Sequence, residues 1–192
     1  MHVSWSGPYS WPGFEETSGL PQLPNGPGVY LWTVQYADGY LIYVAGLTVG
    51  FRKRFGQHTE KYLAGGYTVF DIAEMHNGRR KEVWHGAEWA GWRWTERPER
   101  KAEFIQRGTE IRDATNLQLG AFRVFVTPID IQRLRQRMEA AVMNCLYAAP
   151  SPMCDLPDKG MHLSPRRPDE EPITVWNACG SKLHGLPEHL SI

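Results

Sequence analysis

The clearest pattern of hydrophobic and polar positions lies in residues 28–44. Residues 28–35 alternate two sets of side chains, with Val29, Leu31, Thr33 and Gln35 in one set and Tyr30, Trp32 and Val34 in the other. Alternation with period two is typical of a β-strand. Ala37-Asp38-Gly39 has the composition of a turn, and residues 40–44 form a return strand. The sequence therefore predicts a β-hairpin.

Helical periodicity follows the hairpin. Residues 49–63 place Phe51, Phe55 and Tyr62 on one stripe, with Thr48 as the N-cap and Gly65-Gly66 as the stop. Residues 97–117 are predicted to be helical and residues 121–126 to form an apolar strand. Thr127-Pro128 then resembles a helix start, and the helix is expected to run to about Tyr147.

The two ends of the chain have a different composition. Residues 1–27 are rich in Gly, Pro, Ser and Trp and are expected to form an extended arm. Seven of the fourteen prolines lie from Pro150 onward, so residues 149–192 are expected to be a tail packed on the domain.

Composition narrows the class of protein. A chain of 192 residues with 42% hydrophobic content is long enough to bury the core of one domain. It contains neither a run of eighteen apolar residues nor the basic and apolar pattern of a signal peptide, so a cytoplasmic protein is expected. The three cysteines have no paired spacing, which indicates reduced thiols.

The formal net charge is zero, but the charges are unevenly distributed. Residues 1–50 hold three acids and no Lys or Arg, residues 51–150 hold seventeen bases against twelve acids, and residues 151–192 hold four bases against six acids. The middle segment is therefore positive by five charges. A local basic surface of this kind can bind phosphates even on a neutral protein.

Candidate chemistry lies in the same middle segment. Arg54 and His58 are four residues apart on a predicted helix and therefore share one face. Glu139 adjoins the apolar positions Met138 and Val142 of a later helix, where a carboxylate needs a partner. Together with a tyrosine from the hairpin, these groups favour a metal-dependent site that cuts phosphodiester bonds.

In order and spacing these residues resemble the GIY-YIG nuclease family. Gly28-Val29-Tyr30 matches the first motif, and Gly46-Leu47-Thr48 with Phe51 and Arg54 matches the second. His58 and Glu139 then fall at the family's histidine and metal-binding glutamate. The resemblance covers residues 26–148 apart from a long insertion.

The resemblance implies a fold and a division of the chain. The expected fold class is α/β, with a small, largely antiparallel three-stranded sheet flanked by helices. The arm of residues 1–27 precedes a nuclease-like domain of residues 28–148. Residues 66–120 form a helical, tryptophan-rich insertion in it, and the proline-rich tail follows.

The resemblance also implies roles for the site residues. Tyr30 is expected to be the general base, with its pKa lowered by Arg54, while His58 relays the proton. Glu139 is expected to hold a single Mg²⁺ or Mn²⁺. Gly46, Thr48 and Asn177 are possible supports of the site.

One position departs from the family pattern. The place of a second tyrosine is taken by Val44, and Tyr43 stands one residue earlier. A β-bulge at Ala45-Gly46 would turn Tyr43 toward the site and make it a further catalytic residue.

The implied partner is double-stranded DNA, cut in a restriction-like manner or, second, in repair or phage defence. Recognition is expected from the insertion, the arm and the tail. Phosphate contacts are expected from six basic residues, namely Arg52, Lys53, Lys61, Arg79, Arg80 and Lys81. The tryptophans of the insertion, Trp84, Trp89, Trp92 and Trp94, either stack on bases or form a small core.

Simpler roles exist for each site residue. Tyr30 can be a core aromatic, Arg54 part of a solvated basic face, and His58 a packing residue; Glu139 can pair with Arg135 one turn earlier. The alternative function is a non-catalytic module that binds nucleic acid or protein and keeps a degenerate site.

Overall fold

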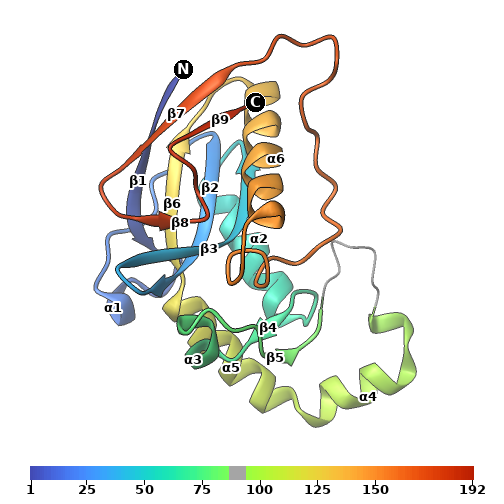
Figure 1. Cartoon of the computed structure of the whole chain (residues 1–192). Coiled ribbons are helices and arrows are strands. Elements are labelled where there is room, and N and C mark those ends of the chain that lie inside the picture. The colour runs from blue at the N-terminus through green and yellow to red at the C-terminus, as the bar shows by residue number, and fades with distance from the viewer. Residues whose placement is uncertain (87–93) are drawn as a thin grey trace.

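The computed structural model describes residues 1–86 and 94–192, and Figure 1 shows the arrangement of the elements. The strands are β1 (His2–Ser10), β2 (Gly28–Tyr36), β3 (Gly39–Thr48), β4 (Val69–Phe70), β5 (Glu82–Trp84), β6 (Arg123–Pro128), β7 (Thr174–Cys179), β8 (Leu183–His184) and β9 (His189–Ser191). The helices are α1 (Glu15–Ser18), α2 (Phe51–Leu63), α3 (Ile72–His76), α4 (Pro98–Gln106), α5 (Gly108–Ala121) and α6 (Gln132–Ala148), with a 3-10 turn η2 (Trp94–Glu96).

The main sheet has seven strands in the order β8-β3-β2-β6-β1-β7-β9, and β4 and β5 form a separate pair. The predicted three-stranded, largely antiparallel sheet is therefore wrong. Its strands β3, β2 and β6 form only one part of a larger mixed sheet, because β1 pairs parallel with β7 and β3 pairs parallel with β8. Local patterns had indicated β2, β3 and β6, whereas the added strands come from the two ends of the chain.

The predicted arm is in fact a strand inside the sheet. β1 lies between β6 and β7, and it buries Val3 and Trp5. Its Gly and Pro content hid this because both residues are depleted in strands. They lie at an irregularity, since the register with β6 shifts between Ser6 and Tyr9. In the same way, the tail supplies β7, β8 and β9.

Each face of the sheet buries its own core. On one face Phe51, Phe55 and Tyr62 of α2 pack with residues of α5 and with Trp32 of β2. On the other face Met138, Val142 and Leu146 of α6 pack against β2, β3 and β1. Figure 1 shows α6 in front of the strands and α2 behind them.

Two predicted helix boundaries shift for a physical reason. Thr127 and Pro128 continue β6 because they pair with Val29 and Gly28 of β2. Strand pairing therefore prevails over the local capping signal, and α6 begins only at Gln132. The predicted helix of residues 97–117 exists as α4 and α5, which meet at Arg107.

Within the described residues, no helix is both long and apolar enough to cross a membrane.

The position of β1 predicts a stability effect. Trp5→Ala should lower the free energy of unfolding by about 3–5 kcal/mol, because a large buried ring would leave a cavity. Trp176→Ala is the control, since that ring is 43% exposed, and it should cost about 1 kcal/mol or less. Urea unfolding followed by circular dichroism measures both changes. Equal effects for the two variants would contradict the placement of Trp5 in the core.

Candidate functional site

Four of the predicted site residues line one cavity of about 90 Å³. Tyr30 comes from β2, Arg54 and His58 come from α2, and Glu139 comes from α6. Gly46 of β3 forms part of the same wall. The structure thus brings together residues that are more than a hundred positions apart in sequence.

Gly46 allows Tyr30 to occupy its place. The two residues are cross-strand partners, and a Cβ atom on Gly46 would lie 2.3 Å from both Cζ and the hydroxyl oxygen of Tyr30. Non-bonded atoms do not approach that closely, so any side chain at position 46 would displace the ring. The absence of a side chain lets the phenol lie over the backbone of β3.

Glu139 reaches the cavity around the edge of the sheet. α6 packs on the face opposite to α2. Among the described residues, however, β8 pairs with β3 only at Tyr40 and Leu41. The other half of β3 is therefore an open edge, where the Leu47 backbone hydrogen-bonds the carboxyl of Glu139. The carboxyl thus faces the same space as Tyr30.

A chain of hydrogen bonds crosses the cavity wall. The Tyr30 hydroxyl lies 2.8 Å from Nε2 of His58, and Nδ1 of His58 lies 3.1 Å from the hydroxyl of Tyr67. The imidazole is only 4% exposed. Both ring nitrogens are therefore paired with phenols, and the ring orientation is defined.

Burial controls the protonation of Tyr30. Desolvation raises its pKa well above the ordinary value of 10.0, although the charge and hydrogen bonding of Arg54 act in the opposite direction. Arg54 therefore acts on the Tyr30 pKa in the predicted direction, but burial outweighs it and keeps the phenol protonated in the cavity as it stands. Removing a phenolate from water costs more than one neighbouring cation returns.

His58 and Glu139 also shift toward their neutral forms. Burial, with the charge of Arg54, lowers the pKa of His58 to about 3. Burial raises the pKa of Glu139 to about 7, against the opposing effects of Arg54 and the Leu47 hydrogen bond. Perturbed groups that gather in one cavity are typical of functional sites.

The donor set of the cavity fits one hard divalent cation. No group of three or more His, Cys, Asp or Glu side chains converges among the described residues, so a cage of protein ligands is absent from that part of the chain. A single carboxylate is the way in which Mg²⁺ often binds, since water and substrate phosphates complete its shell. The pKa of Glu139 is raised because burial outweighs the charge of Arg54, so the carboxylate would gain from a further positive charge beside it.

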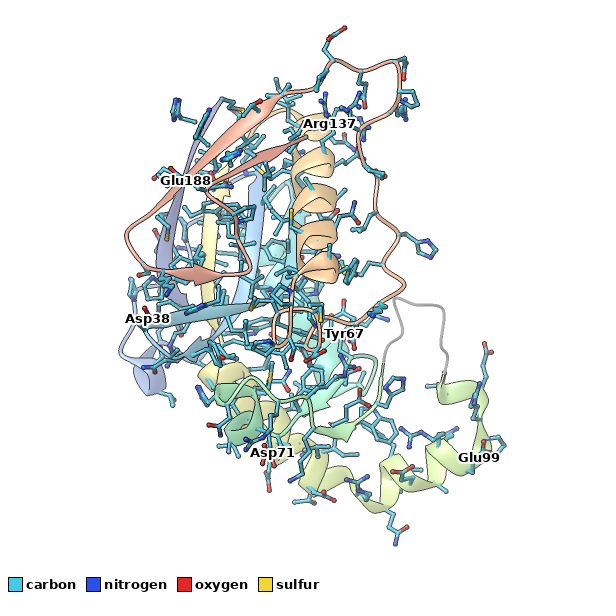
Figure 2. All side chains as sticks on the ribbon, viewed as in Figure 1. Asp38, Tyr67, Asp71, Glu99, Arg137 and Glu188 are labelled. Atoms are coloured by element: carbon cyan, nitrogen blue, oxygen red, sulfur yellow. The ribbon has the colours of Figure 1, made fainter. Side chains whose placement is uncertain are left out.

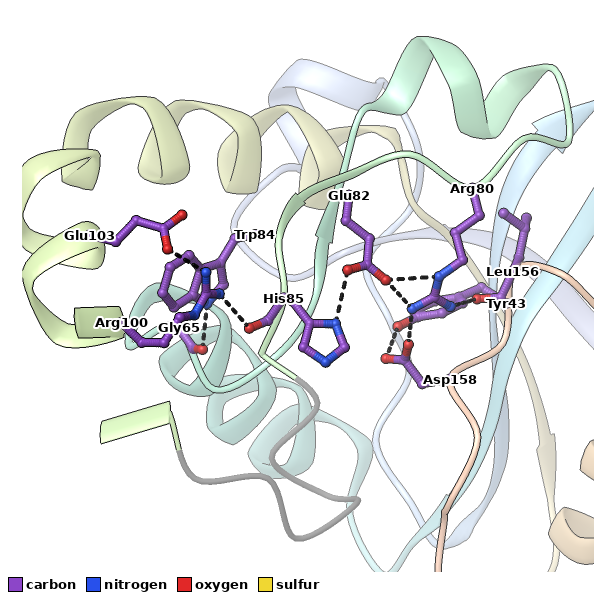
Figure 3. Close-up of polar contacts among 10 residues, drawn as sticks. All are labelled: Tyr43, Gly65, Arg80, Glu82, Trp84, His85, Arg100, Glu103, Leu156 and Asp158. Carbon is purple, nitrogen blue, oxygen red and sulfur yellow. Dashed lines mark hydrogen bonds and ion pairs between the residues drawn. The ribbon is translucent and has the colours of Figure 1, made fainter. Parts of the chain in front are cut away.

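Tyr43 does not line the cavity. The register of β2 and β3 shifts between the pairs Trp32–Val44 and Thr33–Ile42, so a bulge exists at Tyr43 and not at Ala45-Gly46. The Tyr43 ring turns to the α2 side of the sheet, but its hydroxyl donates to Oδ2 of Asp158 at 3.0 Å (Figure 3).

The proposed supports have different positions. The Thr48 hydroxyl accepts from the Gly50 amide at 3.0 Å and thus orders the turn before α2, whose N-cap is Gly50. Asn177 lies on β7, where its side chain accepts from Nε1 of Trp5 at 3.0 Å. It therefore braces the far part of the sheet and takes no part in the cavity wall.

Five of the six predicted basic residues fall into two groups, and Lys61 lies apart from both. Arg79 pairs with Glu74 at 2.5 Å and Lys81 pairs with Asp71 at 2.9 Å. Arg80 pairs with the buried Asp158 and donates to the Leu156 carbonyl at 2.6 Å, as Figure 3 shows. Arg80 thereby ties the tail to the insertion.

The second basic group lies beside the cavity. Arg52 and Lys53 line an open groove of about 810 Å³ at the start of α2, and Arg54 borders both the groove and the cavity. The described residues that line this groove include no acid. Lys61 lies in the last turn of α2, away from the groove lining.

The insertion contributes Trp84 to the core and Tyr67 to the lining of the cavity. Trp84 is buried, donates to the Gly65 carbonyl at 2.7 Å and stacks under Arg100 (Figure 3). This favours the small-core interpretation for Trp84. Trp89, Trp92 and the side chain of Trp94 lie outside the described part of the chain.

Sequence reasoning had placed Trp32, Val44 and Ala45 in the hairpin without a role in the site, and it missed Tyr67 and Met161 of the cavity lining altogether. Tyr67, labelled in Figure 2, belongs to the loop between α2 and β4, and Met161 comes from the tail. Neither residue stands in a periodic segment or a motif. Only the stop signal at Gly65-Gly66 indicated that the chain turns back toward α2 at this point.

The chain matches no protein-family model, and neither a curated protein nor a solved structure shows significant similarity to it. A functional conclusion therefore depends on the geometry of the cavity.

The raised pKa of Glu139 predicts a pH-dependent change in stability. Glu139→Gln should raise the free energy of unfolding by up to about 3 kcal/mol at pH 8, because burial raises the pKa of Glu139 from 4.5 to about 7 and one pKa unit is worth about 1.4 kcal/mol. At pH 4.5 the gain should be small, because the folded carboxyl is then protonated and half of the unfolded carboxyls are too. The gain should grow as the pH rises from 4.5 toward about 7.

Urea unfolding at the two pH values measures this effect. Glu60→Gln, at an exposed position of α2, is the control and should change little at either pH. Unchanged or reduced stability of Glu139→Gln at pH 8 would show that the carboxyl is well compensated in the folded protein.

Proposed function

We propose that this protein is a divalent-metal-dependent phosphodiesterase that cuts double-stranded DNA. The observation that carries the proposal is the convergence of Tyr30, Arg54, His58 and Glu139 on one cavity. A phenol that can pass its proton on, a fixed cation and a metal-binding carboxylate are the groups that phosphodiester hydrolysis requires.

The size of the cavity favours a polymer as the substrate. At about 90 Å³ it is well below the roughly 300–1,000 Å³ of most small-molecule sites. It suits a few water molecules or one phosphate group. The adjoining groove with Arg52 and Lys53 would hold the rest of the substrate, since its positive charge attracts a phosphate backbone.

Arg54 connects the groove with the cavity. Among the described residues that line the cavity, it supplies the one guanidinium or ammonium cation, and it interacts with both Tyr30 and Glu139. A phosphate that leaves the groove and enters the cavity would meet paired N–H donors there. The charge of Arg54 then stabilises the negative charge that develops on the phosphoryl oxygens.

Glu139 would hold Mg²⁺ or Mn²⁺, which supplies positive charge to the phosphate and to the departing oxygen. Tyr30 would take a proton from the attacking water while its own proton passes to His58. Because burial disfavours both phenolate and imidazolium, the two transfers should be concerted. A free phenolate is thereby avoided.

Cleavage of supercoiled plasmid with Mg²⁺, with Mn²⁺ and with chelator tests the proposal. Tyr30→Phe should lower the single-turnover rate at saturating DNA by about 10²–10⁴-fold, the usual contribution of a positioned base. Tyr43→Phe is the matched control, because it removes a buried hydroxyl on the same side of the sheet, and it should cut at nearly the original rate.

Glu139→Gln should abolish metal-dependent cutting and leave metal-free DNA binding nearly unchanged. DNA binding without cleavage under every metal condition would identify the protein as a binding module. The same set of substrates should include single-stranded DNA and double-stranded RNA, so that the substrate class is tested as well.

The groove gives a separate prediction about affinity. Arg52→Ala with Lys53→Ala should weaken DNA binding and reduce the slope of log K against log salt by up to about 0.9 for each phosphate that the variant fails to neutralise. Arg79→Ala with Lys81→Ala removes the same charge from exposed ion pairs outside the groove and should change the slope little. Fluorescence anisotropy with a labelled duplex measures both variants. Equal slopes for the two variants would exclude the groove as the DNA path.

A further inference from the structure

We propose that Tyr67 is a positioning residue that keeps the His58 proton on Nδ1, so that Nε2 is the acceptor for the Tyr30 proton. The position of the proton on the His58 ring can be measured directly. The role of Tyr67 in catalysis, in contrast, rests on the proposed function. Tyr67 stands outside the motifs of the sequence, in the loop after α2.

The first argument is geometric. The imidazole of His58 lies between two phenols, with Nε2 at 2.8 Å from the Tyr30 oxygen and Nδ1 at 3.1 Å from the Tyr67 oxygen. Phenols can donate or accept, so distance alone allows either tautomer. The ring is buried and its pKa is lowered to about 3, so it carries a single proton at neutral pH.

Arg54 favours one of the two arrangements, and Tyr67 provides the acceptor that this arrangement needs. A guanidinium can only donate, and Arg54 hydrogen-bonds to the Tyr30 oxygen. The Arg54 charge therefore favours the orientation in which the Tyr30 hydroxyl proton points away from Arg54 and toward an acceptor. Nε2 of His58 is in place for this, and the ring proton must then be on Nδ1, where the Tyr67 oxygen accepts it.

The loop that carries Tyr67 is held in position by packing. The Tyr67 ring lies 5.1 Å from the Tyr62 ring and 5.7 Å from the His58 ring, measured between centroids. A Cβ atom on Gly86 would lie 2.4 Å from the Tyr67 carbonyl carbon. Gly86 therefore lets the chain pass close to the backbone of Tyr67, and the hydroxyl is held against the imidazole.

The tautomer decides whether His58 can assist Tyr30. With the proton on Nδ1, the Tyr30 O–H bond breaks as an Nε2–H bond forms, and the Tyr30 oxygen gains the proton of the attacking water. The imidazolium that results keeps its Nδ1–H bond to Tyr67. With the proton on Nε2 there is no free electron pair facing Tyr30, and this transfer cannot begin.

The test is ¹⁵N NMR of the full chain labelled at histidine, with His58→Asn used to assign the His58 signals. We expect Nδ1 of His58 to be protonated and Nε2 to be unprotonated at pH 7. In Tyr67→Phe the acceptor at Nδ1 is removed, and a substantial fraction of the ring should carry the proton on Nε2. Tyr62→Phe removes the neighbouring phenol and should keep the original tautomer.

Cleavage provides a second readout. The single-turnover rate of Tyr67→Phe at saturating DNA should fall by about 10- to 100-fold, which is part of the roughly 10²–10⁴-fold that a positioned base contributes. The affinity of this variant for DNA should be unchanged. A proton on Nε2 in the unmodified protein, or an unchanged tautomer in Tyr67→Phe, would overturn the proposal even if the variant were unstable. If the tautomer changes but the unmodified protein never cuts DNA, the role of Tyr67 stands and the proposed function fails.

Discussion

The cavity depends on the contact between the Tyr30 ring and the backbone of Gly46. Only a residue without Cβ leaves room for the phenol at this cross-strand pair. The ring then covers β3 and directs its hydroxyl to the imidazole of His58, which α2 buries from the other side. The positions of Arg54 and Tyr67 are defined in turn, because both contact this phenol–imidazole pair.

The same burial that fixes the geometry keeps the cavity close to neutral. It raises the pKa of Tyr30 and Glu139 and lowers that of His58, and Arg54 is the one fixed charge among the described residues of the wall. Positive charge that entered the cavity would lower the pKa of Tyr30 and of Glu139 and so favour their ionised forms. Under the proposed function, a cation and a phosphate would bind together, and each would make the binding of the other more favourable.

A second buried network joins the tail to the insertion. Asp158 accepts from Tyr43 and pairs with Arg80, and the Tyr147 hydroxyl donates to its carbonyl at 3.0 Å. A buried carboxylate needs such partners. The network holds the segment before Met161, which lines the cavity. A basic cluster that resembled a DNA contact in the sequence thus has a structural role at Arg80.

Local sequence signals determined the hairpin of β2 and β3, the buried stripe of α2, and the shared face of Arg54 and His58, because these depend on periodicities within one element. They also indicated Glu139, since a carboxylate beside an apolar stripe requires a partner. They did not determine the seven-stranded sheet, the role of β1, or the contributions of Tyr67 and Met161, because each depends on which distant segments meet. The protonation of Tyr30 was likewise decided only by tertiary structure, because burial is a property of the assembled core and here outweighs the neighbouring cation.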